Sequence, residues 1–249
     1  MAKAVGILSI EGTIENLTFY RRDGKIFVRR KGGVSKHRIE TDPNYVRTRE
    51  NMNEFKQSAK AGKLLRVALH GLVIKAKDNR LSSRMFQTMF RIKNLDTTSV
   101  RGNRRVAIGL STPAGKTSLK GFDFNANAPL NGVLFAPFDL DTTSGKITFT
   151  DFVSATELLF PEGATHASIQ GAALAINFDT AFSEISYSPK ENFTLSMTPS
   201  TFSLTPNSLP GGGAVTVFLL SVAFFQEVGG VQYPMKNEEF NVLNIIDVV

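Results

Sequence analysis

The feature that most constrains the fold of this chain is the series of short apolar stretches, separated by turn residues, that begins after Leu95. Thr, Ser, Gly, Pro and Asn alternate there with aromatic and β-branched residues, and turn clusters such as the Pro-Gly-Gly-Gly of 210–213 recur between the stretches. This texture is typical of many short strands joined by tight connections. It predicts an antiparallel β-sandwich, Ig-like or jelly-roll-like, over residues 101–249. We expect strands near 105–110, 119–124, 132–135, 146–152, 165–178, 184–187, 193–197, 214–226, 231–233 and 240–248.

Residues 1–100 predict a basic β-hairpin followed by helices. Strands are expected at 5–10, 13–20 and 26–30. The Asp23-Gly24 pair favours a tight hairpin turn before the last strand. Alternation places Leu17 and Phe19 on one face, with apolar partners available on the other arm. Residues 35–38 are expected to form a loop after the hairpin.

A helical pattern follows the loop. Asp42 and Pro43 suit a helix start, because Asp caps free backbone donors and Pro fits the first helical position. Apolar residues then recur three or four positions apart over 46–73, and Ser82 or Ser83 is expected to cap a further helix. One face of that helix comprises Met85, Met89 and Ile92. The chain is therefore predicted to be α+β, mainly β, with domains at 1–100 and 101–249.

These helices have two interpretations. They can form a helix-turn-helix reader of DNA, with Arg84, Arg91 and Lys93 facing a groove. They can also pack their apolar stripes against the strands or against another subunit, which is the commoner role of such stripes.

Charge divides the chain into two unlike halves. Residues 1–120 contain 26 of the 29 Lys and Arg and 9 of the 22 Asp and Glu, a net charge of +17, whereas residues 121–249 contain 3 and 13, a net charge of −10. Such asymmetry favours a basic face that meets a polyanion, or subunits that pair the basic part of one copy with the acidic part of the next. A solvated basic surface is the alternative explanation.

The candidate binding residues are the cations gathered on the hairpin and in the loop after it. Arg offers paired donors to phosphate or carboxylate, so a twisted ribbon tipped with guanidinium groups suits either anion. The predicted polyanion-binding residues are Arg21, Arg22, Lys25, Arg29, Arg30, Lys31, Lys36 and Arg38.

Residue sets that carry catalysis or bind metals are missing from the sequence. It has no Cys, and its three His, at 37, 70 and 166, are more than 30 residues apart, which is unlike the spacing of zinc ligands. His70 lies on an apolar helical stretch and is expected to be a packing residue. The stretch 109–117 resembles a phosphate-binding loop but has five residues between its glycines instead of four, and a strand is expected after it where a helix is needed. We expect no catalytic residue, no metal and no cofactor, and hence no enzyme.

The sequence also bears on location. The first ten residues lack the charged start and long apolar stretch of a signal peptide, and the longest apolar run, 215–225, is shorter than the about 20 residues of a membrane span. We expect a protein without a signal peptide or membrane span, located in the cytoplasm or in an assembled particle.

Four stretches of the first 100 residues carry a resemblance. They are 4–20 (AVGILSIEGTIENLTFY), 28–36 (VRRKGGVSK), 47–51 (RTREN) and 62–66 (GKLLR). They resemble a conserved family of Bacteroidota proteins to which we assign no activity, so the resemblance implies no catalytic or binding residues. The layout of a basic arm ahead of a β-sandwich also resembles small viral coat subunits, at the level of architecture.

We expect a non-enzymatic, self-assembling structural subunit of a particle, tube or phage-like apparatus. Its basic N-terminal region would contact acidic neighbours or enclosed nucleic acid, and the protein would form a homo-oligomer. The alternative is a nucleic-acid-binding accessory protein that uses residues 21–38 and the helices. An enzyme with a carboxylate site that has no sequence signature is a third hypothesis.

Overall fold

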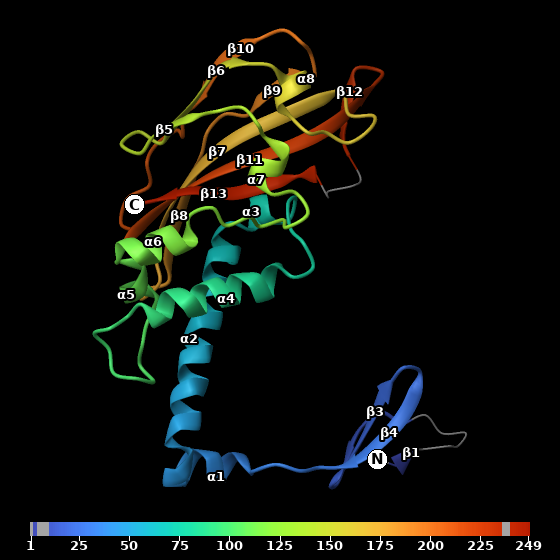
Figure 1. Cartoon of the computed structure of the whole chain (residues 1–249), viewed down its shortest axis with the longest axis vertical. Helices are drawn as coiled ribbons and strands as arrows, with labels where there is room; N and C mark the ends of the chain where they lie inside the picture. The colour runs from blue at the N-terminus through green and yellow to red at the C-terminus, as the bar shows by residue number, and fades with distance from the viewer. Residues whose placement is uncertain (1, 4–9, 236–239) are drawn as a thin grey trace. The chain divides into compact units, whose positions relative to one another are not determined.

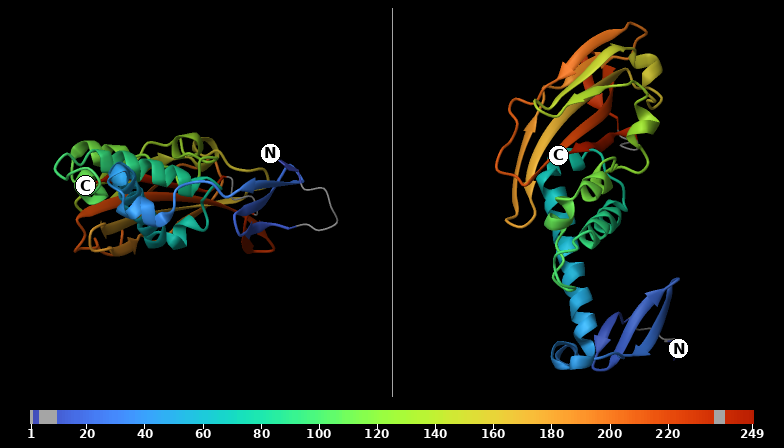
Figure 2. Two further views of the ribbon diagram at one scale, coloured as in Figure 1. Left: turned by 90° about the horizontal axis from the view of Figure 1, so that it is seen from below. Right: turned by 60° about the vertical axis from the view of Figure 1, so that its left-hand side comes forward.

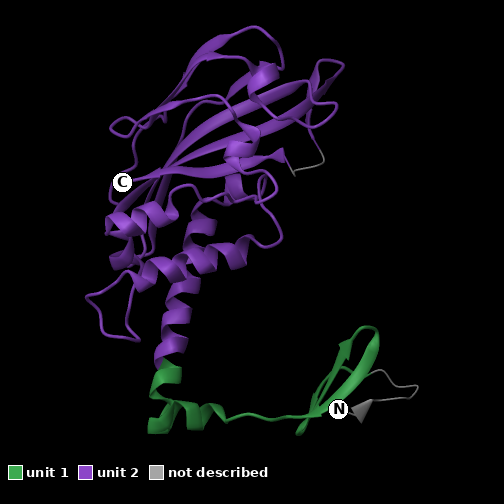
Figure 3. Ribbon diagram, viewed as in Figure 1, with its two compact units in different colours: residues 1–49 green, residues 50–249 purple. Residues whose placement is uncertain are grey.

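The chain forms two compact units, Met1–Arg49 and Glu50–Val249 (Figure 3). The computed structural model describes residues 2–3, 10–235 and 240–249. The predicted boundary near residue 100 falls inside the second unit, so the helical region after residue 50 belongs with the strands of the second half. The structure is a mixed α+β fold with a large share of antiparallel strand.

The first unit contains a four-stranded antiparallel sheet in the order β1-β4-β3-β2. Its strands are β1 (Ala2–Lys3), β2 (Gly12–Ile14), β3 (Leu17–Arg22) and β4 (Lys25–Arg30). The predicted hairpin turn is confirmed, because Arg22 pairs with Lys25 and both Asp23 and Gly24 have positive φ, 51° and 73°. The predicted strand 13–20 is instead two strands, since a turn with Glu15 at φ 50° separates them. Most of the predicted strand 5–10 lies outside the described residues.

The segment after the sheet is helical where a loop was expected. Ser35 caps α1 (Lys36–Thr41) by accepting a hydrogen bond from the Arg38 N–H, which the sequence analysis did not consider. The helix start at Asp42 is confirmed: its carboxylate accepts from the Asn44 N–H at 2.9 Å and begins η1 (Pro43–Tyr45). The long helix α2 (Val46–Ala68) follows directly.

The second unit has more helix than the sequence analysis predicted. Its remaining helices are α3 (His70–Val73), α4 (Leu81–Asn94), α5 (Val106–Leu110), α6 (Pro113–Leu119), α7 (Leu130–Val133) and α8 (Ser154–Glu157). The predicted strand 105–110 is therefore wrong, and 119–124 and 132–135 each contain only an isolated antiparallel bridge, Asp123 to Asn244 and Leu134 to Leu158. Short apolar runs do not reveal their period, and here tertiary packing decides for helix. Gly109, for example, lies so close to α4 that an added Cβ would be 2.0 Å from the Ile92 carbonyl oxygen.

The start of α4 also differs from the prediction. Neither Ser82 nor Ser83 caps it, since the helix begins at Leu81 and the Asp78 carboxylate accepts from the Arg80 N–H at 2.6 Å. The predicted face is confirmed, with Met85, Met89 and Ile92 buried. Lys93, however, is buried and Arg84 is bound to Asp78 and to two backbone carbonyls, so two of the three cations that a helix-turn-helix would present are occupied. Core packing is therefore the role of these helices.

Two antiparallel sheets make up the β part of the second unit. A three-stranded sheet has the order β10-β6-β5, and a six-stranded sheet has β11 and β7 at its centre. The predicted strands 146–152, 165–178, 184–187, 193–197, 214–226, 231–233 and 240–248 correspond to observed strands, whereas β5 and β10 were not predicted. The strands are β5 (Asp139–Asp141), β6 (Lys146–Phe152), β7 (His166–Asn177), β8 (Phe182–Tyr187), β9 (Glu191–Thr194), β10 (Ser200–Leu204), β11 (Val215–Val228), β12 (Val231–Pro234) and β13 (Val242–Val248).

The six-stranded sheet lies between the helices and the three-stranded sheet (Figures 1 and 2), and a hydrophobic core fills the space on each of its sides. Because side chains alternate along a strand, Leu174 and Leu219 face the helices α2 to α6, whereas Phe218 and Leu220 face the three-stranded sheet. The second unit therefore covers both faces of its central strands. No helix of the described residues is long and apolar enough to cross a membrane.

A buried ion pair fixes the loop 95–105 to α2. The Lys93 ammonium donates to the Glu54 carboxylate, and Glu54 accepts a second hydrogen bond from the Gly102 N–H at 2.8 Å. Burial by itself raises the pKa of Glu54, but the hydrogen bonds from Lys93 and Gly102 outweigh it and lower the pKa below its usual range. The charged pair thus belongs to the packing of the second unit.

Candidate polyanion-binding sheet

The eight predicted polyanion-binding residues all lie in the first unit. Six of them belong to the hairpin or follow it directly, and the other two, Lys36 and Arg38, lie on α1. The structure thus brings the hairpin cations onto one sheet and leaves the α1 pair on a separate element. Both α1 cations have a local partner, Glu40 at 3.7 Å and Asp42 at 3.2 Å respectively.

The register of the hairpin divides its residues between two faces of the sheet. Residues directly opposite each other on neighbouring antiparallel strands share a face. Phe19 pairs with Val28, whereas Tyr20 pairs with Phe27. We call one side the apolar face, which contains Ile14, Leu17, Phe19, Ile26 and Val28 at its centre and Arg21 and Arg30 at its two ends. We call the other the aromatic-basic face, which contains Tyr20, Arg22, Lys25, Phe27 and Arg29.

The aromatic-basic face has a stacked pair at its centre. The rings of Tyr20 and Phe27 lie 5.8 Å apart with an interplanar angle of 24°, and the Arg29 guanidinium lies 5.5 Å from the centre of the Tyr20 ring. Cations over aromatic rings beside further cations can hold an anion and stack against a flat ligand. The pairing of Tyr20 with Phe27 was not predicted, although the two-residue Asp23-Gly24 turn fixes it by setting the register.

Ion pairs neutralise only part of this sheet. Arg21 lies 2.8 Å from Glu11, and Arg22 lies 3.7 Å from Asp23. Lys25, Arg30 and Lys31 form no salt bridge with any residue that the structure describes. The sheet therefore retains positive charge for an external anion.

Among the described residues of the first unit, none covers the apolar face. Over residues 10–49 no side chain is buried, and Ile14 and Leu17 are 53% and 41% exposed. An isolated sheet needs a covered hydrophobic face to be stable in water. The described residues of the first unit thus form strands and a well-defined turn but no buried core.

Histidines and metal sites do not provide an alternative centre. Among the described residues no group of three His, Cys, Asp or Glu is placed to hold a metal ion. The prediction that His70 packs in the interior is wrong, because its side chain is exposed on α3. The ring nitrogens of His166 are hydrogen-bonded to the hydroxyls of Thr165 and Thr194 at 3.0 and 3.2 Å, and Nε2 lies 3.4 Å from the Glu227 carboxylate. Both ring nitrogens therefore have partners at this strand end.

The stretch 109–117, which resembled a phosphate-binding loop, runs into the short helix α6, where the predicted strand was to follow it. Thr112 caps α6, accepting from the Gly115 N–H at 3.1 Å and donating to the Gly109 carbonyl at 2.6 Å. An added Cβ on Gly115 would be 2.0 Å from the Gly109 carbonyl oxygen, so these glycines serve close packing of the loop on itself. The stretch leaves no open anion cradle.

Comparison with known proteins gives no match: no family model, no curated protein and no solved structure is similar to this chain. The resemblance of the first 100 residues to Bacteroidota proteins stays a prediction.

Proposed function

We propose that the protein is a self-assembling structural subunit whose N-terminal sheet packs its apolar face on a second copy of the chain. The observation that carries the proposal is that the described residues of the first unit form no buried core. Five apolar side chains share one face of a folded sheet, and no side chain of residues 10–49 is buried. Covering each of them contributes about 1 kcal/mol, since full burial of such a side chain is worth about 1.5–3 kcal/mol.

Charge supports a copy of the same chain as the partner. The first unit is rich in Lys and Arg, whereas the residues from 121 onward have a net charge of −10. Exposed carboxylates of that half include Asp139, Asp151, Glu184 and Glu191. Basic and acidic surfaces on one chain steer two copies together as they approach, whereas the apolar face supplies the lasting contact.

The same arrangement fits a particle, tube or phage-like apparatus that encloses nucleic acid. In that role the strands of 139–249 serve as an Ig-like or jelly-roll-like sandwich that forms the wall, and the basic sheet lies on the inside. No catalytic chemistry is needed, and we propose that the protein is not an enzyme. Residence in the cytoplasm or in the particle is part of this proposal.

A second candidate, a nucleic-acid-binding accessory protein, is favoured by the stacked Tyr20–Phe27 pair with Arg29 above it. Bases of a single strand stack on aromatic rings, and phosphates contact the neighbouring cations. In this case the protein would carry nucleic acid and release it as salt rises, because each phosphate contact displaces counterions.

The experiment compares two double variants of the full chain by sedimentation velocity. Phe19→Glu/Val28→Glu places two opposed carboxylates on the apolar face. The matched control, Thr13→Glu/Thr18→Glu, places the same two charges at directly opposed positions on the other face. We expect the first variant to dissociate to single chains and the control to remain assembled.

Absorbance at 260 nm in the same runs separates the two candidates. The structural subunit is supported if the Thr13→Glu/Thr18→Glu control stays assembled and if the assemblies persist in high salt. A wild-type chain that sediments as a monomer contradicts it, and a monomer that carries nucleic acid and sheds it in high salt supports the second candidate. Circular dichroism of both variants checks that the second unit stays folded.

A further inference from the structure

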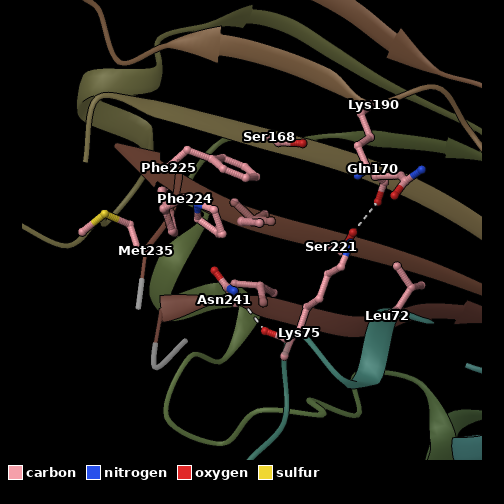
Figure 4. Close-up of a pocket in the computed structure, with 15 residues that line it drawn as sticks. Leu72, Lys75, Ser168, Gln170, Lys190, Ser221, Phe224, Phe225, Met235 and Asn241 are labelled. Carbon is pink, nitrogen blue, oxygen red and sulfur yellow. Dashed lines mark hydrogen bonds between the residues drawn. The ribbon is translucent and has the colours of Figure 1, made fainter. Parts of the chain in front are cut away.

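A cavity in the second unit lies where the helical layer stops covering the six-stranded sheet. On the helix-facing side of β7, Leu174 and Ala172 are buried, and the same side continues to Gln170 and Ser168. On β11 the same side continues from Leu219 to Ser221. The uncovered part of this sheet face forms the floor of a cavity of about 290 Å³ (Figure 4).

The walls of this cavity are apolar and come from three other segments. Leu72 and Ala76 lie at the end of the helical layer, Met235 follows β12, and Val242 begins β13. Phe225 lines it from the end of β11. Ligand pockets have volumes of about 300–1,000 Å³ and mostly apolar walls, so this cavity suits a small molecule with a hydrophobic body.

Two lysines supply the charge of the cavity. Lys75 and Lys190 line it from opposite walls, and Figure 4 shows their side chains extending towards one another over the Gln170–Ser221 floor. No Asp or Glu is among the described lining residues, and neither lysine forms a salt bridge within the described ranges. Two ammonium groups directed at one space repel each other unless an anion lies between them.

Hydrogen bonds hold the floor of the cavity and the backbone of Lys75 in place. The Ser221 hydroxyl donates to the Gln170 carbonyl at 3.1 Å, and the Gln170 amide donates to the Ser188 carbonyl at 2.9 Å. The buried Asn241 side chain donates to the Lys75 carbonyl at 2.9 Å, which fixes the backbone from which this lysine projects. The floor and the backbone at Lys75 are therefore formed before any ligand enters, whereas the exposed side chains of Lys75 and Lys190 become ordered on binding.

We infer that this cavity binds a small carboxylate with an apolar body, with Lys75 and Lys190 holding the carboxylate and the Phe225 side of the cavity holding the body. The inference is independent of the assembly proposed above, since none of the residues it uses lies in the N-terminal sheet. The two lysines recognise the charge, and the apolar walls select ligands with a hydrocarbon chain over small inorganic anions.

Octanoate is a suitable probe, with 1-octanol as its neutral counterpart of equal chain length. Calorimetric titration of the full chain measures the binding of both probes, to the wild type and to the variants Lys75→Met and Lys190→Met, which keep most of the unbranched side chain and remove its charge. Lys146→Met is the matched control, because Lys146 is an exposed lysine of the same unit outside the cavity. Ala223→Phe fills the cavity and leaves both lysines intact.

We expect octanoate to bind and 1-octanol to bind more weakly. Each lysine variant should weaken octanoate about fivefold, the double variant should abolish the preference over octanol, and Lys146→Met should change nothing. Ala223→Phe should abolish binding of both probes. The inference is overturned if octanoate does not bind to the wild-type chain. It is also overturned if the wild-type and doubly substituted chains bind octanoate equally. The unfolding midpoint of each variant checks that it is folded.

Discussion

The buried pair of Lys93 and Glu54 allows a prediction whose magnitude follows from the structure. The two side chains are 1% and 6% exposed, and the Lys93 ammonium also lies 4.1 Å from the centre of the Phe90 ring. Lys93→Met removes the positive charge and leaves a buried carboxylate. Breaking a buried pair in this way costs about 3–5 kcal/mol of unfolding free energy.

Protonation sets an upper limit on that cost. The Glu54 carboxylate can take up a proton in the folded variant. Protonating a Glu with an ordinary pKa of about 4.3 at pH 7 costs about 3.7 kcal/mol. In the variant, the pKa of Glu54 is thus higher in the folded chain than in the unfolded chain. The destabilisation is therefore present at neutral pH and declines as the pH falls. We expect the cost to shrink by up to about 2.7 kcal/mol between pH 7 and pH 5, at 1.36 kcal/mol per pH unit.

Urea denaturation at pH 7 and pH 5 measures this in a cycle of four chains: wild type, Lys93→Met, Glu54→Gln and the double variant. The two changes should be strongly non-additive, because each removes the partner of the other. Lys120→Met is the control, since its salt bridge to Asp247 at 3.1 Å is exposed and worth at most about 1 kcal/mol. Additive effects, or a cost of Lys93→Met that does not change with pH, would refute the reasoning.

Two further predictions concern acid and close packing. Burial by itself raises the pKa of Asp96, but hydrogen bonds from the Arg105 N–H and from its other partners outweigh it and hold the pKa far below its usual range. The corresponding stability is complete above the unfolded pKa of about 4 and is lost as the pH falls through the folded one, so Asp96→Asn should flatten the acid limb of an unfolding curve. Gly109→Ala should lower the unfolding free energy by about 3 kcal/mol, because the added Cβ would meet the Ile92 carbonyl. Gly211→Ala is the control and should have little effect in the same urea denaturation, because open space surrounds Gly211. Equal effects of the two substitutions would contradict the close packing at Gly109.

The hairpin could be predicted because local chemistry determines it. The Asp23-Gly24 turn fixes the register, and alternation then places Phe19 and Tyr20 on opposite faces. The sequence also predicted the long central strands, because runs such as 215–226 are too β-branched and aromatic for a surface helix. The same register assigns each candidate cation of the hairpin to one face of the sheet.

The short helices of 106–133 could not be predicted in the same way. Five apolar residues at 106–110 have no measurable period, and their helical form depends on the contact between Gly109 and α4, 17 positions away at Ile92. The cavity beside Lys75 and Lys190 depends on still more distant segments, since residues 115 positions apart approach one another only in the folded sheet. Neither lysine stands in a local pattern that indicates binding.

The measurement that tests the central claim most directly is the molar mass of the full-length protein by light scattering, over a range of concentrations and at low and high salt. We predict a mass that is a multiple of the single chain and that persists in high salt, because in the assembly we propose the apolar face of the N-terminal sheet is buried between copies. A single-chain mass at every concentration and salt would contradict the account.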